Sequence, residues 1–486
     1  MSKKFQAEAH TCRSAAAGQP SRIARVLDFE NHYLFKGKPH AASPLPPEML
    51  EAVAPAADRS AGFDLVIDLV GDGNAPRGKT TLTLLFNGFP SEKALIGSIM
   101  HGGMPQIALS DQTGAIVATG NPSPELAKGL SGAMEQTYAR VITLILAYIN
   151  HPDRWLHPLS KVEADWPGLK DVAKWIFKMV VTRFVKQIYY RLFLPSHWRV
   201  GWRWVTGQDV WSSLSLDGEP WSVLDDRNNH FYADPVPWKK GGNHYLFFED
   251  LDHKTQKGII SVVKMEKNGP AGPIKPCLEE PFHLSYPFLI EYEGETYMIP
   301  ETSANRKITL YKSSNFPFGW KPFKTILSDI DAADATITRH EGRWWLFCVT
   351  RDGGGGYSDC LSIFYAEDLF GPWLPHAQNP VLVDRATARP AGNFVIRNGR
   401  LCRPVQDCSH SYGWRMQLVE VTELTPEKYE QQSITKLTAN DLWPGRKLHT
   451  LNRAGNLEVI DGAVLRPRSH YFKPITNWLY RPASDD

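Results

Sequence analysis

Three acidic residues stand where a repeated sequence pattern would bring them together: Asp234, Glu301 and Asp334. Enzymes that cleave glycosidic bonds use two carboxyl groups that flank the bond, roughly 5–9 Å apart. We therefore predict that Asp234 and Asp334 form the carboxylate pair and that Glu301 donates the proton. The alternative is that these acids cap strands or pair with Arg389 and Arg403, because ion-pair networks also occur at such sites.

The elements that must position these acids follow from five regularly spaced glycines. They are Gly242, Gly294, Gly342, Gly399 and Gly455, separated by 52, 48, 57 and 56 residues. A period near 50 residues in β-type sequence is typical of propellers, with one supersecondary unit per repeat. Each glycine is expected to supply the positive φ of a tight hairpin turn. The sequence thus predicts an all-β, five-bladed β-propeller.

Strand pairing within each hairpin predicts which side chains lie together. The return strand of an antiparallel hairpin ends beside the start of the first strand. In a propeller these positions share one face, around the central channel. The expected neighbours are Asp234 with Glu249, Tyr286 with Glu301, Asp334 with Thr350, and Arg389 with Gln406 and Asp407.

Six residues of this face are expected to bind the substrate. The two arginines suit an anionic group, which a guanidinium can hold through two parallel hydrogen bonds. The predicted substrate-binding residues are Glu249, Tyr286, Arg389, Arg403, Gln406 and Asp407.

Charge, cysteine spacing and the N-terminal sequence indicate which partners, cofactors and cellular location to expect. A net charge of +2 with 22% charged residues gives no general case for nucleic-acid binding. The six cysteines lack metal-ligand spacing. His449 is either a metal ligand or a polar core residue, and we favour the second, so we expect neither a metal nor another cofactor. The N-terminus lacks the apolar segment of a signal peptide, so the protein is expected to be cytoplasmic.

The chain is expected to be multidomain, with a small α/β domain before the propeller. Residues 63–70 and 80–86 have buried-strand patterns, residues 23–27 form a candidate strand, and residues 123–148 form a candidate helix that Ser123 caps. The predicted organisation is a tail at 1–21, the α/β domain at 22–152, a linker at 153–195, the propeller at 196–470 and a tail at 471–486. A strand at residues 199–205 could complete the last blade.

The linker contains a basic segment at residues 169–194. Lys170, Lys174 and Lys178 recur at four-residue spacing among large apolar residues, which we interpret as an amphipathic helix with a polar stripe. Two interpretations stay open. The helix lies on an anionic membrane surface as a peripheral contact, or it connects two domains and its lysines are simply solvated.

A short motif in the N-terminal part of the chain raises a separate possibility for function, a nucleotide-binding site. Residues 73–80 match the pattern GxxxxGK[ST], but a phosphate site requires a helix directly after Lys79 and Thr80. The following residues have strand character, so we interpret the match as coincidental.

Seven short motifs between about Trp198 and Gly462 carry a family resemblance. They are Ala233-Asp-Pro235, Phe247-Phe-Glu249, His283-Leu-Ser-Tyr-Pro287, Met298-Ile-Pro-Glu301, Arg343-Trp-Trp-Leu-Phe347, Ala388-Arg-Pro-Ala-Gly392 and Arg403-Pro-Val-Gln-Asp407. This stretch resembles the N-terminal domain of plant glucosamine inositolphosphorylceramide transferases. The resemblance implies a propeller like those of arabinanase- and invertase-type glycosidases, and a glycan-related role. The sugar-transferring domain of the plant enzyme is a separate one, and nothing in this chain resembles it.

Two departures qualify what these resemblances imply. The glycosidases combine two aspartates with a glutamate from a later blade, whereas here Arg389 holds that place, which argues against hydrolysis.

Residues 62–150 also resemble a formyltransferase-type domain, whose enzymes use an Asn-His-Asp set. Asn87 corresponds to the first member, but Gly88, Phe89 and Pro90 follow where a histidine is expected. We therefore interpret that domain as degenerate.

Two hypotheses result. In the first, the propeller binds and processes a carbohydrate or glycoconjugate by hydrolase- or transferase-type chemistry. In the second, the same face only binds a glycan or lipid headgroup, and residues 169–194 contact the membrane.

Overall fold

The computed structural model describes residues 21–35 and 62–469, except 70, 72–74, 77, 125–126, 154–155, 163–164, 228, 352, 441 and 444. It divides into two compact units. The first comprises the described residues up to Arg183 together with the loop at 353–356, and the second comprises the rest, from Phe184 onward. The division falls inside the predicted linker. The predicted tails, apart from Ser21, lie outside the described residues.

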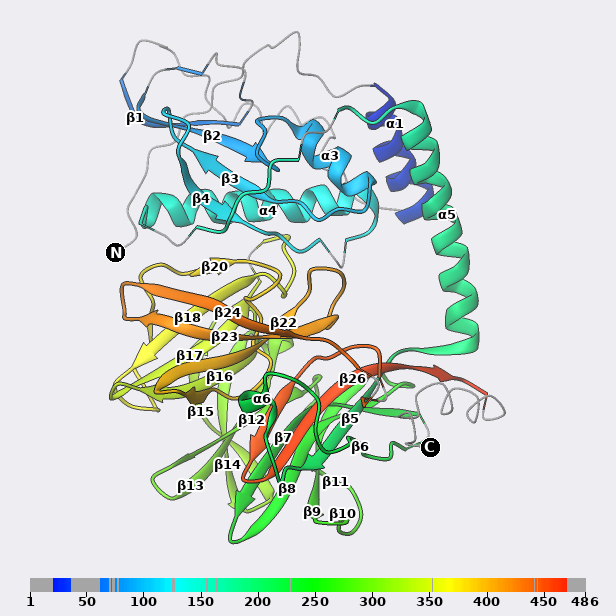
Figure 1. Cartoon of the computed structure of the whole chain (residues 1–486), viewed down its shortest axis with the longest axis vertical. Coiled ribbons are helices and arrows are strands. Elements are labelled where there is room, and N and C mark those ends of the chain that lie inside the picture. Colours follow the sequence, from blue (N-terminus) through cyan, green and yellow to red (C-terminus); the bar gives the residue numbers. More distant parts are fainter. Residues whose placement is uncertain are drawn as a thin grey trace. The chain divides into compact units, whose positions relative to one another are not determined.

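The first unit is built on a four-stranded sheet of order β1-β2-β3-β4. Strands β1 and β2 run parallel, and the other neighbours are antiparallel. Apolar side chains of the sheet and the helices, among them Leu84, Leu95, Ile107 and Met134, form one buried core. Figure 1 shows α4 lying along this sheet. The elements are α1 (Ser21–Phe29), η1 (Glu30–Phe35), β1 (Phe63–Asp68), β2 (Gly78–Phe86), α3 (Glu92–Met100), β3 (Ile107–Ser110), β4 (Ile116–Gly120) and α4 (Gly129–Asn150).

Two predictions for this unit are wrong. The candidate strand at residues 23–27 belongs to helix α1, because Ile23, Val26 and Leu27 repeat at helical spacing and are all buried. Helix α4 begins at Gly129, after an N-cap residue, Lys128, that makes no side-chain capping bond, so Ser123 does not cap it. The residues after Lys79 form strand β2, which agrees with the coincidental nature of the GxxxxGK[ST] match.

Helix α5 (Leu169–Leu192) forms as predicted, but its polar stripe does not. Lys170 and Arg183 lie on roughly opposite sides of the helix at 3.6 residues per turn, so basic and apolar side chains alternate around it. Its first turns pack on the core of the first unit, where Trp175 Nε1 donates to Glu30 Oε1 at 2.8 Å. In the described part of the chain, no helix has the length and apolar character needed to cross a membrane.

The second unit is all-β, as predicted, and contains five sheets (Figure 1). Besides the last turns of α5, from Phe184 onward, it holds two short helices, α6 (Val210–Ser213) and η2 (Ser303–Asn305). We call it the five-sheet unit.

Its first sheet contains β7 (His230–Lys240), β8 (Asn243–Asp252), β9 (Lys257–Glu266), β10 (Gly269–Pro270) and β11 (Lys275–Leu278). The second contains β12 (Ser285–Tyr292), β13 (Glu295–Glu301), β14 (Lys307–Asn315) and β15 (Phe318–Ser328). The third contains β16 (Ala332–His340), β17 (Arg343–Thr350), β18 (Cys360–Ala366), β19 (Leu374–Pro375) and β20 (Leu382–Val383). The fourth contains β21 (Val395–Arg397), β22 (Arg400–Asp407), β23 (Arg415–Leu424) and β24 (Tyr429–Leu437), and the fifth contains β25 (Leu451–Ala454), β26 (Leu457–Pro467), β5 (Phe193–Trp204) and β6 (Ser222–Val223).

The fifth sheet joins the two ends of the unit. Its strand β26 pairs antiparallel with β5, from Leu457 opposite Trp204 to Pro467 opposite Phe193. The predicted strand at residues 199–205 therefore completes the last sheet, and that prediction is confirmed.

The repeated glycines occupy the hairpin turns. All five have positive φ, from 59° at Gly455 to 81° at Gly342. In the first four turns the preceding residue also has positive φ, for example Glu293 at 51° before Gly294 at 78°. Two successive residues with positive φ are what a type I′ hairpin turn requires.

Candidate functional site

The first strands of three sheets carry a shared distortion. Asp234, Tyr286 and Asp334 have φ of 50°, 43° and 55°, and the strand register shifts at each of them. A bulge of this kind redirects a side chain out of the alternation of the strand. Positive φ is uncommon for residues other than glycine, and such residues are found at tight turns and at functional sites. Asp234, Tyr286 and Asp334 thus share the same backbone conformation as well as the same spacing from the turn glycine of their repeat.

The return strands end beside these bulges, as predicted. Glu249 pairs with Ala233, and Glu301 pairs with Ser285. In the fourth repeat the amide of Gln406 donates to the carbonyl of Arg389 at 2.9 Å. We call Asp234, Glu249, Glu301, Asp334 and Asp461 the carboxylate cluster.

One side of the cluster is built around a buried histidine. His449 Nδ1 lies 3.1 Å from both Asp234 Oδ1 and Asp461 Oδ2. Burial lowers the pKa of His449, but the two carboxylates outweigh it and raise that pKa to about 10. The ring is therefore an imidazolium at neutral pH. Its Nε2 lies 2.6 Å from the hydroxyl oxygen of Tyr412, to which the second ring proton is donated.

The other side is built around a buried arginine. Arg389 Nε donates to Asp334 Oδ2 at 2.5 Å, and Gln406 Nε2 donates to the same oxygen at 3.1 Å. The guanidinium also lies over the ring of Tyr412, with its carbon 4.9 Å from the ring centroid. Tyr412 therefore touches both cations, Arg389 and His449.

Burial raises the pKa of both glutamates of the cluster. Burial, together with the charge of Asp334, raises the pKa of Glu301 to about 8, although Arg389 opposes the shift. Burial and the charge of Asp234 raise the pKa of Glu249 well above its ordinary value. Each glutamate thus lies beside an aspartate that has its own cationic partner. A carboxyl group whose pKa is raised towards neutral pH is typical of acid–base sites.

His283 connects Glu249 with solvent. The amide of Gly258 donates to His283 Nδ1 at 3.0 Å, so Nδ1 carries no proton. The proton of the neutral ring then lies on Nε2, which is 3.3 Å from Glu249 Oε1. Burial lowers the pKa of His283, which favours this neutral form. Its side chain is 39% exposed, whereas that of Glu249 is 8% exposed.

The group formed by Asp234, His449 and Asp461 also has the composition of a metal site, since its ligand atoms lie within 4.8 Å of one another. Asp461 Oδ1 accepts from the Thr450 amide and hydroxyl, and Asp461 Oδ2 accepts from the Asp234 amide at 2.8 Å. His449 is buried among these groups, and both interpretations of it, a polar core residue and a metal ligand, fit its position.

Most of the predicted site residues gather here, but two do not contribute free groups. Arg403 is 1% exposed, and its donors bond to Gln431 and to the carbonyls of Thr387 and Ala388. Asp407 is fully buried and accepts from Ser409, Arg415 and Gln417. We correct their expected role from substrate binding to support of the fourth sheet.

Tyr286 is also a supporting residue. Its hydroxyl bonds Thr336 Oγ1 at 2.8 Å, and its side chain is buried. Its amide donates to Asp234 Oδ2 at 3.2 Å. The backbone of Tyr286, more than its ring, thus serves the carboxylate cluster.

Sequence reasoning missed Asp461 and Tyr412. Asp461 stands near the end of the return strand of the fifth repeat, six residues after Gly455, where Glu249 stands seven after Gly242. The spacing from the turn glycine could therefore have identified Asp461 from the sequence. Tyr412 lies in the loop between β22 and β23, where the repeat gives no signal.

In the first unit, Asn87 has a structural role. Its Nδ2 donates to the carbonyl of Ala94 at 3.1 Å, and its Oδ1 accepts from the amide of Gln106 at 2.9 Å. The side chain is buried and its φ is 49°. These bonds hold the turn that follows β2, so both polar groups of the side chain already have partners.

The comparison with known proteins concerns the five-sheet unit. Residues 222–461 match the family model described as glucosamine inositolphosphorylceramide transferase 1, N-terminal. The resemblance expected from the motifs is thereby confirmed.

Two curated relatives carry the name glucosamine inositolphosphorylceramide transferase 1. The rice protein (Oryza sativa subsp. japonica) is 33% identical over 249 residues, which cover 48% of this chain and 33% of the relative. The Arabidopsis thaliana protein is 35% identical over 210 residues, which cover 42% of this chain and 27% of the relative. The chain thus spans about a third or less of the relatives that it matches.

Comparison with solved structures finds several glycoside hydrolases. A family 117 enzyme of Zobellia galactanivorans has a TM-score of 0.35 and 11% identity, covering 51% of this chain and 77% of its own. A GH43 β-xylosidase/α-arabinofuranosidase from a compost metagenome has a TM-score of 0.32 and 16% identity, covering 49% and 92%. At such values the likeness gives no information on the roles of individual residues.

Proposed function

We propose that the five-sheet unit is a five-bladed β-propeller that binds a carbohydrate or glycoconjugate at the carboxylate cluster and transfers or hydrolyses a glycosyl group there. The observation that carries this proposal is Glu301, whose pKa of about 8 keeps it protonated at neutral pH beside Asp334. The five sheets and the pairing of β5 with β26 support a closed ring, in which these residues share one face.

In this proposal Glu301 is the general acid. It gives its proton to the glycosidic oxygen while the bond from that oxygen to the anomeric carbon breaks. A water molecule or an acceptor hydroxyl forms the new bond to the anomeric carbon, and its proton passes to Asp234 or Asp334. General acid catalysis is most effective when the pKa lies near the working pH, which the value for Glu301 satisfies.

The cationic side chains hold this arrangement in place. His449 and Arg389 balance the charges of Asp234 and Asp334, so two carboxylates can remain in a buried site beside Glu249 and Glu301. In this proposal a sugar enters beside His283, whose side chain is partly exposed and lies next to Glu249.

The test compares wild type with Asp234→Asn and Glu301→Gln on a glycoconjugate panel. The name of the relatives suggests glucosamine-containing and inositol-phosphate-containing compounds as first probes. Product formation is followed by mass spectrometry, and folding by circular dichroism. We expect both variants to fold and to lose turnover. Wild-type turnover that persists in Asp234→Asn would contradict the assignment.

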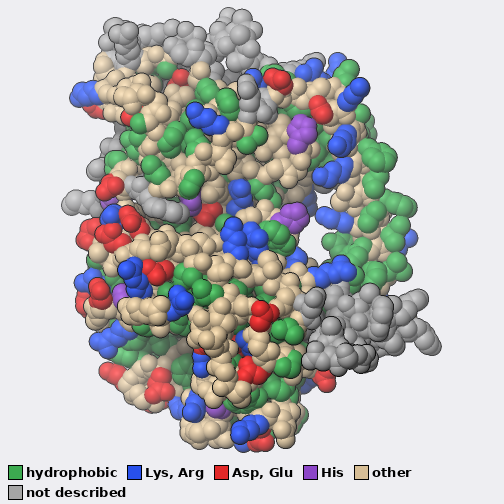
Figure 2. Space-filling model, in the orientation of Figure 1, with side chains coloured by type: hydrophobic (Ala, Val, Ile, Leu, Met, Phe, Trp, Pro, Cys, Tyr) green, Lys and Arg blue, Asp and Glu red, His purple; other side chains and the backbone are tan. Residues whose placement is uncertain are grey.

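Helix α5 favours a second candidate function, a glycan- or lipid-binding module at a membrane surface. Phe177 and Phe184 are 69% and 62% exposed, and further apolar side chains of α5 are exposed between the basic ones. Figure 2 shows hydrophobic and basic side chains side by side along the segment labelled α5 in Figure 1. Exposed apolar groups with lysines and arginines are suited to the interface of an anionic bilayer.

Vesicle flotation tests this second candidate. The protein should float with vesicles that contain phosphatidylserine and less so with neutral ones, and added salt should weaken the binding. Changing Lys170, Lys174 and Lys178 to Glu should abolish it. Lys321→Glu with Lys324→Glu, on exposed positions of β15, is the control for altered charge. Equal flotation of the triple variant and wild type would exclude the membrane role of α5.

A further inference from the structure

The five-sheet unit has a pocket at the opposite ends of the strands from the carboxylate cluster. Its volume is about 590 Å³. It lies between the turn of the β7–β8 hairpin, at Gly242, and the turn of the β25–β26 hairpin, at Gly455. Asp234 stands eight residues before Gly242 on the same hairpin, which at about 3.3 Å per residue is about 26 Å of strand. The pocket is therefore a separate site.

The pocket has an excess of positive charge. Three lysines line it, Lys239, Lys264 and Lys267, against one carboxylate, Glu266. Lys264 Nζ pairs with Glu266 Oε1 at 3.2 Å. Lys239 and Lys267 are exposed and take part in none of the ion pairs found among the described residues. Two ammonium groups thus remain for a ligand with negative charge.

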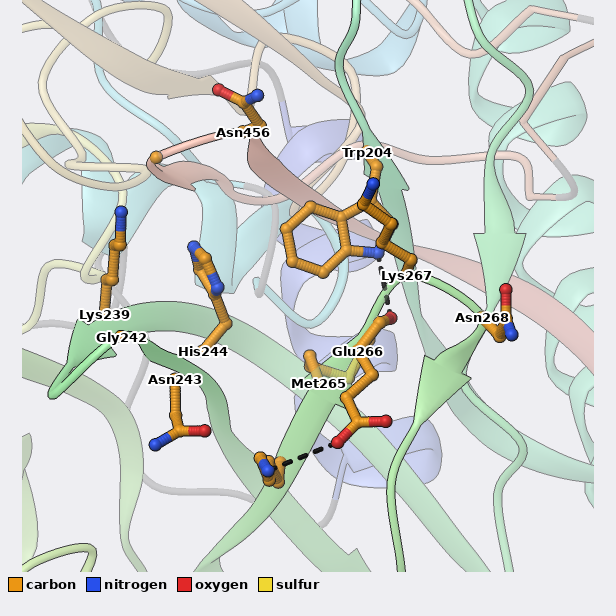
Figure 3. A pocket seen from close by; sticks show the side chains of 12 residues that line it. Trp204, Lys239, Gly242, Asn243, His244, Met265, Glu266, Lys267, Asn268 and Asn456 are labelled. Atoms are coloured by element: carbon orange, nitrogen blue, oxygen red, sulfur yellow. Dashed lines mark hydrogen bonds and ion pairs between the residues drawn. The ribbon is translucent and has the colours of Figure 1, made fainter.

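An indole ring with a fixed orientation forms one wall. Trp204 Nε1 donates to the carbonyl of Glu266 at 3.0 Å, so its polar group is occupied. The ring of His244 meets the indole edge to face, with 4.9 Å between centroids and an interplanar angle of 90°. Figure 3 shows Trp204 beside His244, with its nitrogen directed at residue 266. A held aromatic ring with a polar surround is suited to the apolar face of a sugar ring.

Amide side chains complete the pocket. Asn243, Asn268 and Asn456 reach it from three different turns (Figure 3). Asn243 Nδ2 donates to the carbonyl of Gly241 at 3.3 Å, and its Oδ1 remains an acceptor. Side-chain amides supply both donors and acceptors, which is what sugar hydroxyl groups require. A site for an inorganic ion alone would not use an aromatic wall or three amides.

We infer that this pocket binds a sugar that carries a negative charge, either a phosphorylated sugar or a uronic acid. Lys239 and Lys267 pair with the anionic group, Trp204 stacks on the ring, and the asparagines bond its hydroxyls. The site would hold a charged part of a glycoconjugate at a distance from the carboxylate cluster, and it does not depend on catalysis there.

Isothermal titration calorimetry with four probes tests the inference: glucose 6-phosphate, glucuronate, glucose and inorganic phosphate. We expect at least one charged sugar to bind more tightly than glucose and than phosphate. Reversing two charges in Lys239→Glu with Lys267→Glu should weaken that binding about tenfold or more, the loss of at least one charged hydrogen bond. The Trp204 indole NH resonance of wild type, identified with Trp204→Phe, should shift on binding.

Two controls separate this site from others. Lys321→Glu with Lys324→Glu makes the same charge change elsewhere and should bind as wild type does. Asp234→Asn, which alters the carboxylate cluster, should also bind as wild type does. The inference is overturned if no charged sugar binds, if phosphate binds as well as the charged sugar, if the pocket variant binds normally, or if Asp234→Asn alone removes binding.

Discussion

Arg389 Nε donates to Asp334 Oδ2 at 2.5 Å and so joins the third and fourth repeats across 55 positions of the chain. Both side chains are nearly inaccessible, at 9% and 3% exposure. The charge of Asp334 also helps to keep Glu301 protonated, because it opposes a second negative charge nearby. One ion pair thus links the stability of the unit with the acidity of the proposed proton donor.

Removal of the guanidinium should destabilise the five-sheet unit strongly. In Arg389→Met, Asp334 remains buried without its cation, and breaking such a pair costs about 3–5 kcal/mol. Urea denaturation gives the free energy of unfolding. Arg400→Met is the matched control, because Arg400 pairs with Glu420 at 2.7 Å but is 61% exposed. That variant should lose less than about 1 kcal/mol. Similar losses in both variants would contradict the importance of the buried pair.

His449 should be an imidazolium at neutral pH. Ring nitrogen chemical shifts should show two protonated nitrogens at pH 7.5, because Asp461 and Asp234 raise its pKa to about 10. A raised pKa stabilises the fold fully below the ordinary value of 6.5, and this stabilisation is lost as the pH rises through about 10. The gap in unfolding free energy between wild type and His449→Gln should therefore shrink over that range. A neutral ring at pH 7.5 would contradict this description.

The raised pKa of Glu301 should also make the free energy of unfolding fall as the pH rises, over a lower pH range than for His449. Its folded pKa of about 8 lies above the ordinary 4.5, so its contribution is present below 4.5 and is lost as the pH rises through 8. Wild type should lose unfolding free energy relative to Glu301→Gln between these values and change little above them. Glu341→Gln, at a residue whose side chain is 81% exposed, is the control and should follow wild type. A constant difference between wild type and Glu301→Gln would refute the raised pKa.

The turn glycines should be required for backbone geometry alone. A Cβ on Gly294 would meet no heavy atom within 4 Å, so only its φ of 78° resists substitution. Gly294→Ala should cost about 1–2 kcal/mol of unfolding free energy, the strain of a left-handed residue. Gly294→Asn should cost less, because Asn tolerates this conformation better. Both are measured by urea denaturation, and an alanine variant as stable as wild type would contradict the turn assignment.

The sequence revealed the parts of the site that recur. Gly242 and its counterparts impose one hairpin per repeat, and an antiparallel hairpin necessarily brings Glu249 to the level of Asp234. The positive φ of Asp234 could not be inferred, because the bulge depends on the register of the neighbouring strand. The same holds for His449, whose charge results from two aspartates that come from different strands.

The predictions that failed rested on local patterns that tertiary packing overrides. Residues 23–27 have β-branched character, yet Ile23, Val26 and Leu27 share one helical face against the core. Arg403 has the chemistry of an anion-binding residue, but Gln431 and two carbonyls use its donors. Whether an arginine has free donors depends on neighbours from other strands, which no motif specifies.

The central claim is that Glu301 donates a proton during glycosyl transfer or hydrolysis. The most direct measurement is the pH dependence of product formation by wild type and Glu301→Gln, followed by mass spectrometry on the glycoconjugate panel. We predict that wild-type turnover falls as the pH rises through about 8, where Glu301 loses its proton. We also predict that Glu301→Gln is at least about 100-fold slower at neutral pH. Turnover in Glu301→Gln at the wild-type rate, with an unchanged pH profile, would contradict the claim.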